Sequence, residues 1–185
     1  SVSWLPSVRN LCTQGGRVVP TRAGSGSPGK HVRLVPGHPI AGSEQSGVEA
    51  ANAGLFRRHK VILTPCEHSD ESAVALVESL WRELGAAVEV MEVEHHDQVL
   101  AATSHLPHLL AFTLVDSLAK RSENLEIFRY AAGGFRDFTR IAGSDPVMWH
   151  DIFLSNRDAV LRVIDHFTHD LEQLRTAIAN QDSAT

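Results

Sequence analysis

Three short stretches of the sequence combine residue types that can bind and transform an acidic substrate. The first, SHLPH at residues 104–108, places Ser104 and His108 four residues apart, so both side chains share one face of a helix. Pro107 cannot donate a hydrogen bond to the carbonyl of Thr103, and we expect a bend there. The stretch fits either the polar wall of a pocket or a structural kink whose polar groups are satisfied.

The second stretch, FRDFTR, follows a turn predicted at Gly133-Gly134 and carries cations on a short helix. Arg136 and Arg140 lie one turn apart with Asp137 between them. A guanidinium binds a carboxylate through two parallel hydrogen bonds, which suits an acidic substrate. The same spacing also fits a solvated Arg–Asp pair on a helix surface, which contributes little to stability.

The third stretch, HPIAGSE at residues 38–44, joins an ionisable ring to a rigid proline and a flexible glycine. A histidine at the end of a strand in an open α/β sheet lies where such folds bind ligands. The pKa range of histidine suits a general base. A loop histidine within a turn is the simpler interpretation of His38.

The elements that must position these residues fall into two parts, of which residues 31–93 have an α/β pattern. An apolar run in HVRLVPGHPIAG ends at Pro36-Gly37, and KVILTP predicts a strand. A helix follows, capped by Ser69 or Asp70 and stopped at Gly85. Its predicted apolar face comprises Ala73, Val77, Leu80, Trp81 and Leu84. VEVMEVE then alternates as a strand, so the order predicts a right-handed crossover in a mostly parallel sheet.

Residues 94–185 are predicted to be nearly all helix. The stretch from His95 to Lys120 is apolar on most sides, so we expect it to be buried. Asp145-Pro146 supplies a cap and a first-turn proline for a further helix. In the last helix a heptad seam repeats at Val160, Ile164, Phe167, Leu171, Leu174 and Ile178. Such a narrow seam packs against a partner helix, in the same chain or in a second subunit.

Composition limits the classes of function that the chain can have. Its 185 residues favour one ordinary domain or two small ones, and 43% hydrophobic residues are enough for a core. The net charge of −5 argues against nucleic acid or an anionic membrane as the main partner. We expect no membrane span, because no apolar run approaches the roughly 20 residues required. Two cysteines are too few for a disulfide framework, which favours a reducing compartment such as the cytoplasm.

Eleven histidines also raise the alternative of a metal-binding helical protein. His105 and His108 are three residues apart, as are His166 and His169, and the sequence His95-His96-Asp97 adds further ligand types. However, no second cluster at ligand-like spacing completes a closed site, so we expect no metal.

Taken in order, four stretches closely resemble the prephenate/arogenate (cyclohexadienyl) dehydrogenase family of tyrosine biosynthesis. They are HPIAGSEQSG, LFRRHKVILTP, HDQVLAATSHLPHLLAF and GGFRDFTRIAGSDPVMWHDI, and the resemblance runs from about residue 31 to about residue 180. It implies a Rossmann-like dinucleotide-binding domain followed by an all-α helical dimerisation domain. The implied reaction is an oxidative decarboxylation in which NAD or NADP takes a hydride from the ring carbon bearing the hydroxyl. Prephenate then gives 4-hydroxyphenylpyruvate, and arogenate gives tyrosine.

The resemblance also assigns roles to individual residues. His38 matches the catalytic histidine, and Arg140 matches an arginine that binds a substrate carboxylate, so we expect both to converge on one cavity. The other matching positions are those lining the substrate pocket, Ser104, His108 and Trp149, and those forming a gate at its mouth, Glu44 and Asp137. A homodimer formed through the helical domain and tyrosine as a feedback ligand are further expectations.

The sequence departs from the family pattern before residue 31. GSGSPGK at residues 24–30 is glycine-rich, but no convincing strand precedes it and no helix follows, so we reject it as a phosphate loop. The acidic residue for the ribose and the D-x-x-S-V-K turn are also missing. We therefore expect a fragment, with an irregular segment at 1–30, the end of the dinucleotide-binding domain at 31–93 and the helical domain at 94–185. Such a chain is expected not to oxidise prephenate alone; the alternative is a non-catalytic dimerisation or ligand-binding module.

Overall fold

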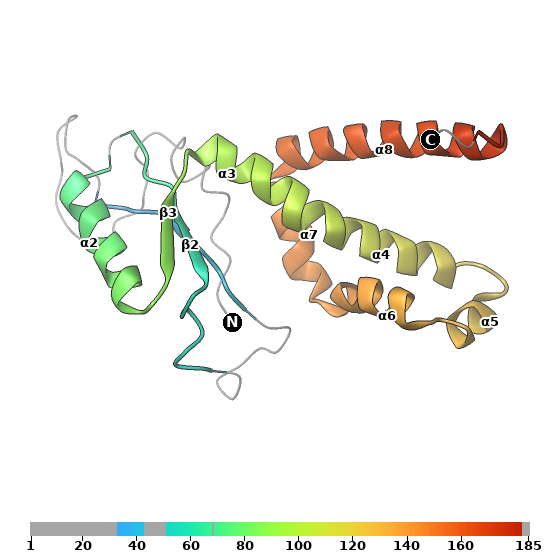
Figure 1. Ribbon diagram of the computed structural model, residues 1–185, viewed down its shortest axis with the longest axis horizontal. Helices are drawn as coiled ribbons and strands as arrows, with labels where there is room; N and C mark the ends of the chain where they lie inside the picture. The colour runs from blue at the N-terminus through green and yellow to red at the C-terminus, as the bar shows by residue number, and fades with distance from the viewer. Residues whose placement is uncertain (1–32, 43–50, 68, 183–185) are drawn as a thin grey trace. The chain divides into compact units, whose positions relative to one another are not determined.

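The computed structural model describes residues 33–42, 51–67 and 69–182. The chain divides into two compact units, residues 1–96 and residues 97–185. In the described residues, the first unit contains a small sheet with a helix beside it, and the second unit is helical (Figure 1). The expectations for the segment 1–30 and for Glu44 lie outside the described residues.

Among the described residues the sheet of the first unit has three strands, in the order β1 (Gly37–Ile40), β2 (Lys60–Leu63) and β3 (Ala87–Val90). Strand β2 pairs in parallel with β3 and is joined to it through helix α2 (Glu71–Glu83), as the sequence predicts. Strand β1 pairs antiparallel with β2. The prediction of a mostly parallel sheet was therefore correct for the crossover and wrong for β1.

Strand β1 begins where we expected an apolar run to end. Gly37 is its first residue, and His38 lies opposite Ile62 of β2. The expectation that His38 sits in a turn after a strand was therefore wrong. Pro39 is tolerated because β1 forms one edge of the described sheet, where a missing backbone donor costs little.

Helix α2 starts and stops at the predicted residues. The Asp70 carboxylate accepts hydrogen bonds from the backbone N–H of Ser72 at 2.8 Å and of Ala73 at 3.3 Å. Gly85 adopts a positive φ of 82° just after the helix, a conformation that glycine tolerates without strain. These local signals confirm the predicted helix boundaries.

The buried face of α2 differs from the predicted one. Val77 and Trp81 pack against the core formed by Val61, Leu63 and Ala86. Leu80 and Leu84, which we expected on this face, are 56% and 44% exposed. Leu80 directly precedes Trp81, and one residue rotates a side chain by about 100° around a helix, so Leu80 faces away from the core. Leu84 follows the last residue of the helix, Glu83.

Removing the cap of α2 tests the local account of this helix. Replacing Asp70 with alanine is expected to lower the free energy of unfolding of the first unit by about 1 kcal/mol, because two helix N–H groups lose their acceptor. Urea denaturation followed by circular dichroism measures the change. Asp70→Ser keeps a capping oxygen and should retain most of the stability. A loss of the same size in both variants would contradict the capping role.

The helical region begins with α3 (Val93–Leu100), a π-helical segment η2 (Ala101–His105) and α4 (Leu106–Ala119). It continues with α5 (Asn124–Arg129), α6 (Gly133–Thr139), the 3-10 segment η3 (Arg140–Gly143), α7 (Pro146–Ser155) and α8 (Arg157–Ala179). Asp145 caps α7 by accepting from the N–H of Val147 at 2.8 Å, which confirms the predicted start of this helix.

The irregularity predicted at Pro107 takes the form of the π-helical segment η2. The N–H of Leu106 donates to the carbonyl of Ala101, five residues earlier. The Thr103 hydroxyl donates to the Val99 carbonyl at 2.7 Å. Isolated π turns inside α-helices occur often at functional sites, and this one contains Ser104 and immediately precedes the helix that carries His108.

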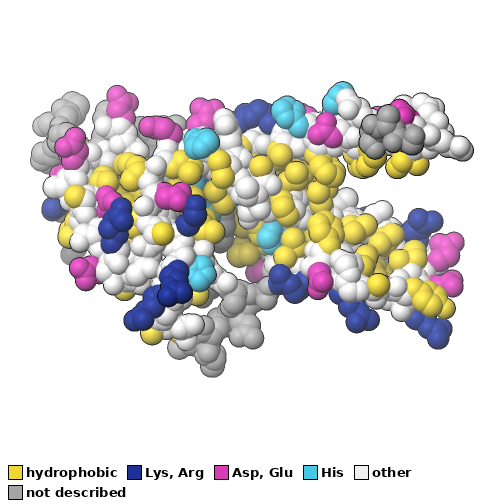
Figure 2. All heavy atoms as spheres, in the orientation of Figure 1, with side chains coloured by type: hydrophobic (Ala, Val, Ile, Leu, Met, Phe, Trp, Pro, Cys, Tyr) yellow, Lys and Arg dark blue, Asp and Glu magenta, His cyan; other side chains and the backbone are white. Residues whose placement is uncertain are grey.

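The helix from Val93 to Ala119 is more exposed than the sequence suggested. By length and composition it could cross a membrane, yet only 22% of its apolar window is buried in the molecule. The expectations that no apolar run approaches this length and that the stretch is buried were both wrong. Hydrophobic side chains are visible on the surface of the helical unit (Figure 2).

The heptad seam of α8 is buried at only one end. Val160 packs with Ala101 and Ala159 in the core of the helical unit. Further along the same seam, Leu171 and Ile178 are 52% and 68% exposed. The described part of the chain therefore leaves half of an apolar seam exposed.

Candidate functional site

His38 forms a close pair with another histidine of the first unit. Its Nδ1 lies 3.0 Å from Nε2 of His96, which is 6% exposed. The two rings meet edge to face with centroids 5.3 Å apart. Burial and the neighbouring His96 lower the pKa of His38 from an ordinary value of 6.5 to about 4. The ring is therefore neutral at neutral pH, which is the state that a general base requires.

His108 is held by its own helix and by an aromatic neighbour. Its Nδ1 donates to the Ser104 carbonyl at 2.8 Å, and its ring stacks on Trp149 with centroids 3.7 Å apart. Burial lowers the pKa of His108, although the hydrogen bond to the Ser104 carbonyl opposes the shift. Since a carbonyl only accepts, the hydrogen of the neutral ring sits on Nδ1 and Nε2 is an acceptor.

The predicted grouping of Ser104, His108 and Trp149 is thus present in the structure. The hydrogen bond between Ser104 and His108 uses the Ser104 carbonyl rather than its hydroxyl. Trp149 is 6% exposed, and its buried Nε1 has no hydrogen-bond partner among the described residues. A buried indole N–H without an acceptor is costly, which makes it a donor suited to a ligand oxygen.

His105 and Asn156 stabilise the segment that carries these residues. The Asn156 amide nitrogen donates to the Asp97 carbonyl at 2.8 Å and lies 3.3 Å from Nδ1 of His105. Because the bond to the carbonyl fixes this nitrogen as the donor, the Nδ1 of His105 accepts and its neutral ring carries the hydrogen on Nε2. The bond therefore ties η2 to the junction between α7 and α8.

Arg140 is the first residue of η3 and not part of α6, which ends at Thr139. Gly133 and Gly134 are the first residues of α6, so the turn predicted there was wrong. Arg136, Asp137 and Arg140 all have exposed side chains. Segment η3 packs against α4, the helix that carries His108. The convergence of His38 with Arg140 stays a prediction.

Two residues with polar roles were not singled out by the sequence motifs. His96 belongs only to the group of histidines at metal-ligand spacing, and Asn156 belongs to none of the motifs. Position 96 did carry a signal, because it lies four residues before Leu100 and both are buried on α3. Nothing in the local sequence marks Asn156, whose partners lie more than fifty residues away.

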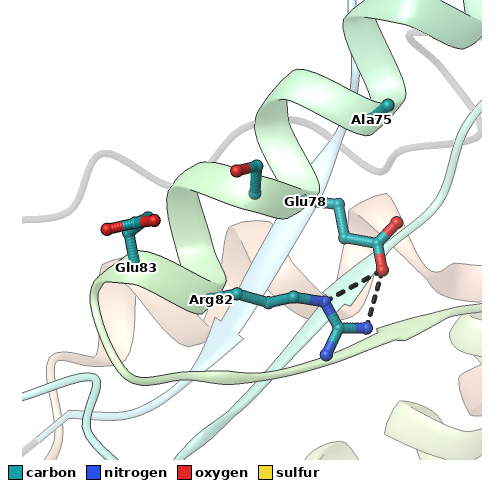
Figure 3. A pocket seen from close by; sticks show the side chains of 5 residues that line it. Ala75, Glu78, Arg82 and Glu83 are labelled. Atoms are coloured by element: carbon teal, nitrogen blue, oxygen red, sulfur yellow. Dashed lines mark hydrogen bonds and ion pairs between the residues drawn. The ribbon is translucent and has the colours of Figure 1, made fainter.

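A surface pocket on α2 is separate from these residues. It is lined by Ala75, Glu78, Ser79, Arg82 and Glu83, all from one helix (Figure 3). Arg82 donates to the Glu78 carboxylate at 2.6 Å and 3.1 Å. An exposed pair one helical turn apart contributes little, and we assign no function to this pocket.

The described residues form no cradle for the pyrophosphate of a dinucleotide. The N-terminal amides of α2, which follow a strand as such a site requires, are already bonded to Asp70. Gly24, Gly26 and Gly29 do have the G-x-G-x-x-G spacing, although we rejected the segment on its context. These glycines lie outside the described residues.

Two family models match the chain. One is described as prephenate dehydrogenase, nucleotide-binding domain, and covers residues 23–90. The other is described as prephenate dehydrogenase, dimerization domain, and covers residues 92–185. Together they confirm the fold class expected from the sequence, part of a nucleotide-binding domain followed by a helical domain.

Curated relatives and solved structures agree with these models. The chain is 49% identical over 151 residues to a cyclohexadienyl dehydrogenase of Zymomonas mobilis, covering 80% of this chain and 52% of that protein. It is 42% identical to a Bacillus subtilis prephenate dehydrogenase, covering 82% and 41%. The crystal structure of prephenate dehydrogenase from A. aeolicus in complex with hydroxyphenyl propionate and NAD+ matches with a TM-score of 0.75 at 47% identity, covering 80% and 52%.

A structure of Synechocystis arogenate dehydrogenase matches with a TM-score of 0.73 at 30% identity, covering 82% of this chain and 56% of that one. The chain therefore spans about half the length of the relatives it matches. Both units match models of one family, which confirms the family that the sequence motifs suggested. The chain belongs to the prephenate dehydrogenase family.

Proposed function

We propose that this chain supplies the base and the substrate-binding residues of an NAD- or NADP-dependent prephenate or arogenate dehydrogenase. The observation that carries the proposal is the neutral ring of His38, a residue of strand β1, which is hydrogen-bonded to a buried histidine. The names of the relatives support the same activity. In this proposal residues 31–93 belong to the dinucleotide-binding domain and residues 94–185 to the substrate-binding and dimerisation domain.

The chemistry explains why a neutral imidazole is useful. Oxidative decarboxylation removes a hydride from the ring carbon bearing the hydroxyl and releases the ring carboxylate as carbon dioxide. Positive charge develops at that carbon as hydride leaves, and a base that accepts the hydroxyl proton relieves it. His38 performs this role. The described residues form no pyrophosphate cradle that would hold NAD or NADP.

Substrate binding is assigned to the helical unit. Arg140 binds a carboxylate, because an exposed guanidinium can form two parallel hydrogen bonds to it. Trp149 offers its buried Nε1–H, and His108 and Ser104 complete the polar lining. Asp137 is proposed as a gating residue at the pocket mouth, and the same role for Glu44 rests on the family resemblance alone.

The exposed apolar surface of the helical unit supports a homodimer. The seam of α8 and the helix from Val93 to Ala119 leave hydrophobic surface uncovered, and the matching family model is named for dimerization. A soluble, cytoplasmic dimer with no membrane contact explains this surface without a lipid partner. Tyrosine, which shares a six-membered ring with a para hydroxyl and a side-chain carboxylate with the substrates, is the proposed feedback ligand.

Calorimetry with 3-(4-hydroxyphenyl)propionate, combined with an assay of NADH formation from prephenate, tests the proposal. We expect the chain to bind the ligand but to form no NADH, because the described residues hold no cradle for the cofactor. Binding without turnover is also the behaviour of the alternative, a ligand-binding module derived from the family. NADH formation would establish the enzyme and refute that alternative. Failure to bind either the propionate or prephenate would overturn the proposal.

Replacing Arg140 with glutamine should weaken binding of the hydroxyphenyl propionate by about 10- to 100-fold, because a charged hydrogen-bond partner of the carboxylate is lost. Arg136→Gln is the matched control, since Arg136 is exposed, carries the same charge and lies one turn earlier. Equal weakening by both variants would indicate a general effect of charge rather than a specific contact.

A further inference from the structure

The partner of His38 has no role in the function proposed so far. His96 lies 58 residues further along the chain, on α3, and its Nε2 is 3.0 Å from His38 Nδ1. It is 6% exposed, and its backbone N–H donates to the Glu92 carbonyl at 2.9 Å, so it belongs to a regular helix. We propose that His96 is a positioning residue that fixes the ring orientation and the tautomer of His38 by accepting a hydrogen bond from its Nδ1–H.

The short distance between the two ring nitrogens requires that one of them carries a hydrogen and the other accepts it. A bond of 3.0 Å needs one donor and one acceptor, which leaves two arrangements of the neutral pair. In the first, His38 Nδ1–H donates to His96, and the lone pair of His38 lies on Nε2. In the second, His96 donates, and His38 carries its hydrogen on Nε2 and cannot accept a proton there.

Only the first arrangement provides a base at Nε2, so the inference rests on the proposed function. It also keeps the hydrogen bond intact when His38 takes a proton, because Nδ1–H still donates to His96 Nε2. A neutral acceptor stabilises the resulting imidazolium less than a carboxylate would. His96 therefore orients the base without holding its proton strongly, which favours release of the proton after each reaction.

The rigidity of the pair follows from the elements that carry it. His38 is fixed in β1 by its pairing with β2, and His96 is fixed in α3. The edge-to-face contact at 61° between the rings restricts rotation of each. Neither side chain extends from a loop tip, and sites on regular elements hold their geometry more closely than sites on loops.

Nuclear magnetic resonance of the full chain with isotope-labelled histidine tests the proposal without substrate or cofactor. Long-range nitrogen–proton correlations at neutral pH should show His38 as the Nδ1–H tautomer. In His96→Leu this tautomer should be lost, because the acceptor is gone and an isolated imidazole prefers Nε2–H. His96→Gln keeps an acceptor oxygen and should restore it. His95→Leu removes the adjacent, exposed histidine and should leave His38 unchanged.

The wild-type spectrum alone can overturn the inference. If His38 carries its hydrogen on Nε2, His96 is the donor and the assignment is wrong, whether or not the variants fold. Retention of the Nδ1–H tautomer in a folded His96→Leu variant would also refute it. If the tautomer is as expected but the chain does not bind the hydroxyphenyl propionate, the positioning role stands and the proposed function fails.

Discussion

Replacing Trp149 with alanine is expected to lower the free energy of unfolding of the helical unit by about 3–5 kcal/mol. The side chain is 6% exposed, and its ring lies 3.7 Å from the His108 ring and 5.5 Å from Phe153 between centroids. Truncation leaves a cavity that the surrounding helices can fill only in part. The indole also covers one face of His108, so its removal exposes that histidine to water.

Guanidinium denaturation monitored by circular dichroism, with a histidine-specific resonance of His108 as a second probe, measures both effects. Trp149→Phe keeps an aromatic ring and should lose only part of the stability. Val147→Ala changes an exposed residue of the same helix and should cost little. A loss below about 1 kcal/mol in Trp149→Ala would show that the site collapses freely and that the stacked ring is not a core element.

Acidification is expected to destabilise the first unit between pH 6.5 and about 4. Burial, followed by the neighbouring His96, lowers the pKa of His38 from 6.5 to about 4 in the folded state. The unfolded chain therefore binds a proton over this range while the folded chain does not, so stability falls as pH falls. Above pH 6.5 the first unit keeps the full contribution of His38 to its free energy of unfolding. The part of this free energy lost through His38 reaches at most roughly 3 kcal/mol near pH 4.

A pH series of urea denaturation curves for the wild type and His38→Gln isolates this contribution. The variant lacks the titrating ring and should show a flatter loss of stability over the same range. His95→Gln removes an exposed histidine and should follow the wild type. The same slope in His38→Gln and the wild type would mean that other groups, including the acid-titrating carboxylates, account for the whole effect.

Features decided by neighbouring residues were predictable from the sequence. The caps at Asp70 and Asp145 and the stop at Gly85 each depend on a few adjacent backbone groups, and all three occur where expected. The parallel crossover between β2 and β3 was also predictable, since alternating strand and helix patterns are compatible with few sheet topologies. The family motifs followed the same logic, because each is a local string.

Features decided by tertiary packing were not predictable in this way. The start of β1 at Gly37 depends on pairing with β2. The apolar residues alone predicted an extended run that ends at Pro36-Gly37, before the observed strand. Leu80 and Leu84 look like core residues, yet the sheet meets the adjacent stripe of α2. The His38–His96 pair joins residues 58 positions apart, so its existence required the fold.

The π-helical segment from Ala101 to His105 lets this helix hold one more residue in a turn than a regular α-helix can. Its wide turn accommodates a residue that an unbroken helical period would exclude, which sets the angular phase of everything that follows. Five residues in a π turn rotate the chain about as far as four residues of an α-helix, so deleting one residue there would restore the ordinary period and keep His108 on the side of Trp149. Forcing all five residues into the ordinary period would instead rotate the His108 side of α4 by about 100° away from Trp149. The wide turn of this short segment, rather than its composition, therefore determines which face of α4 carries the polar residues.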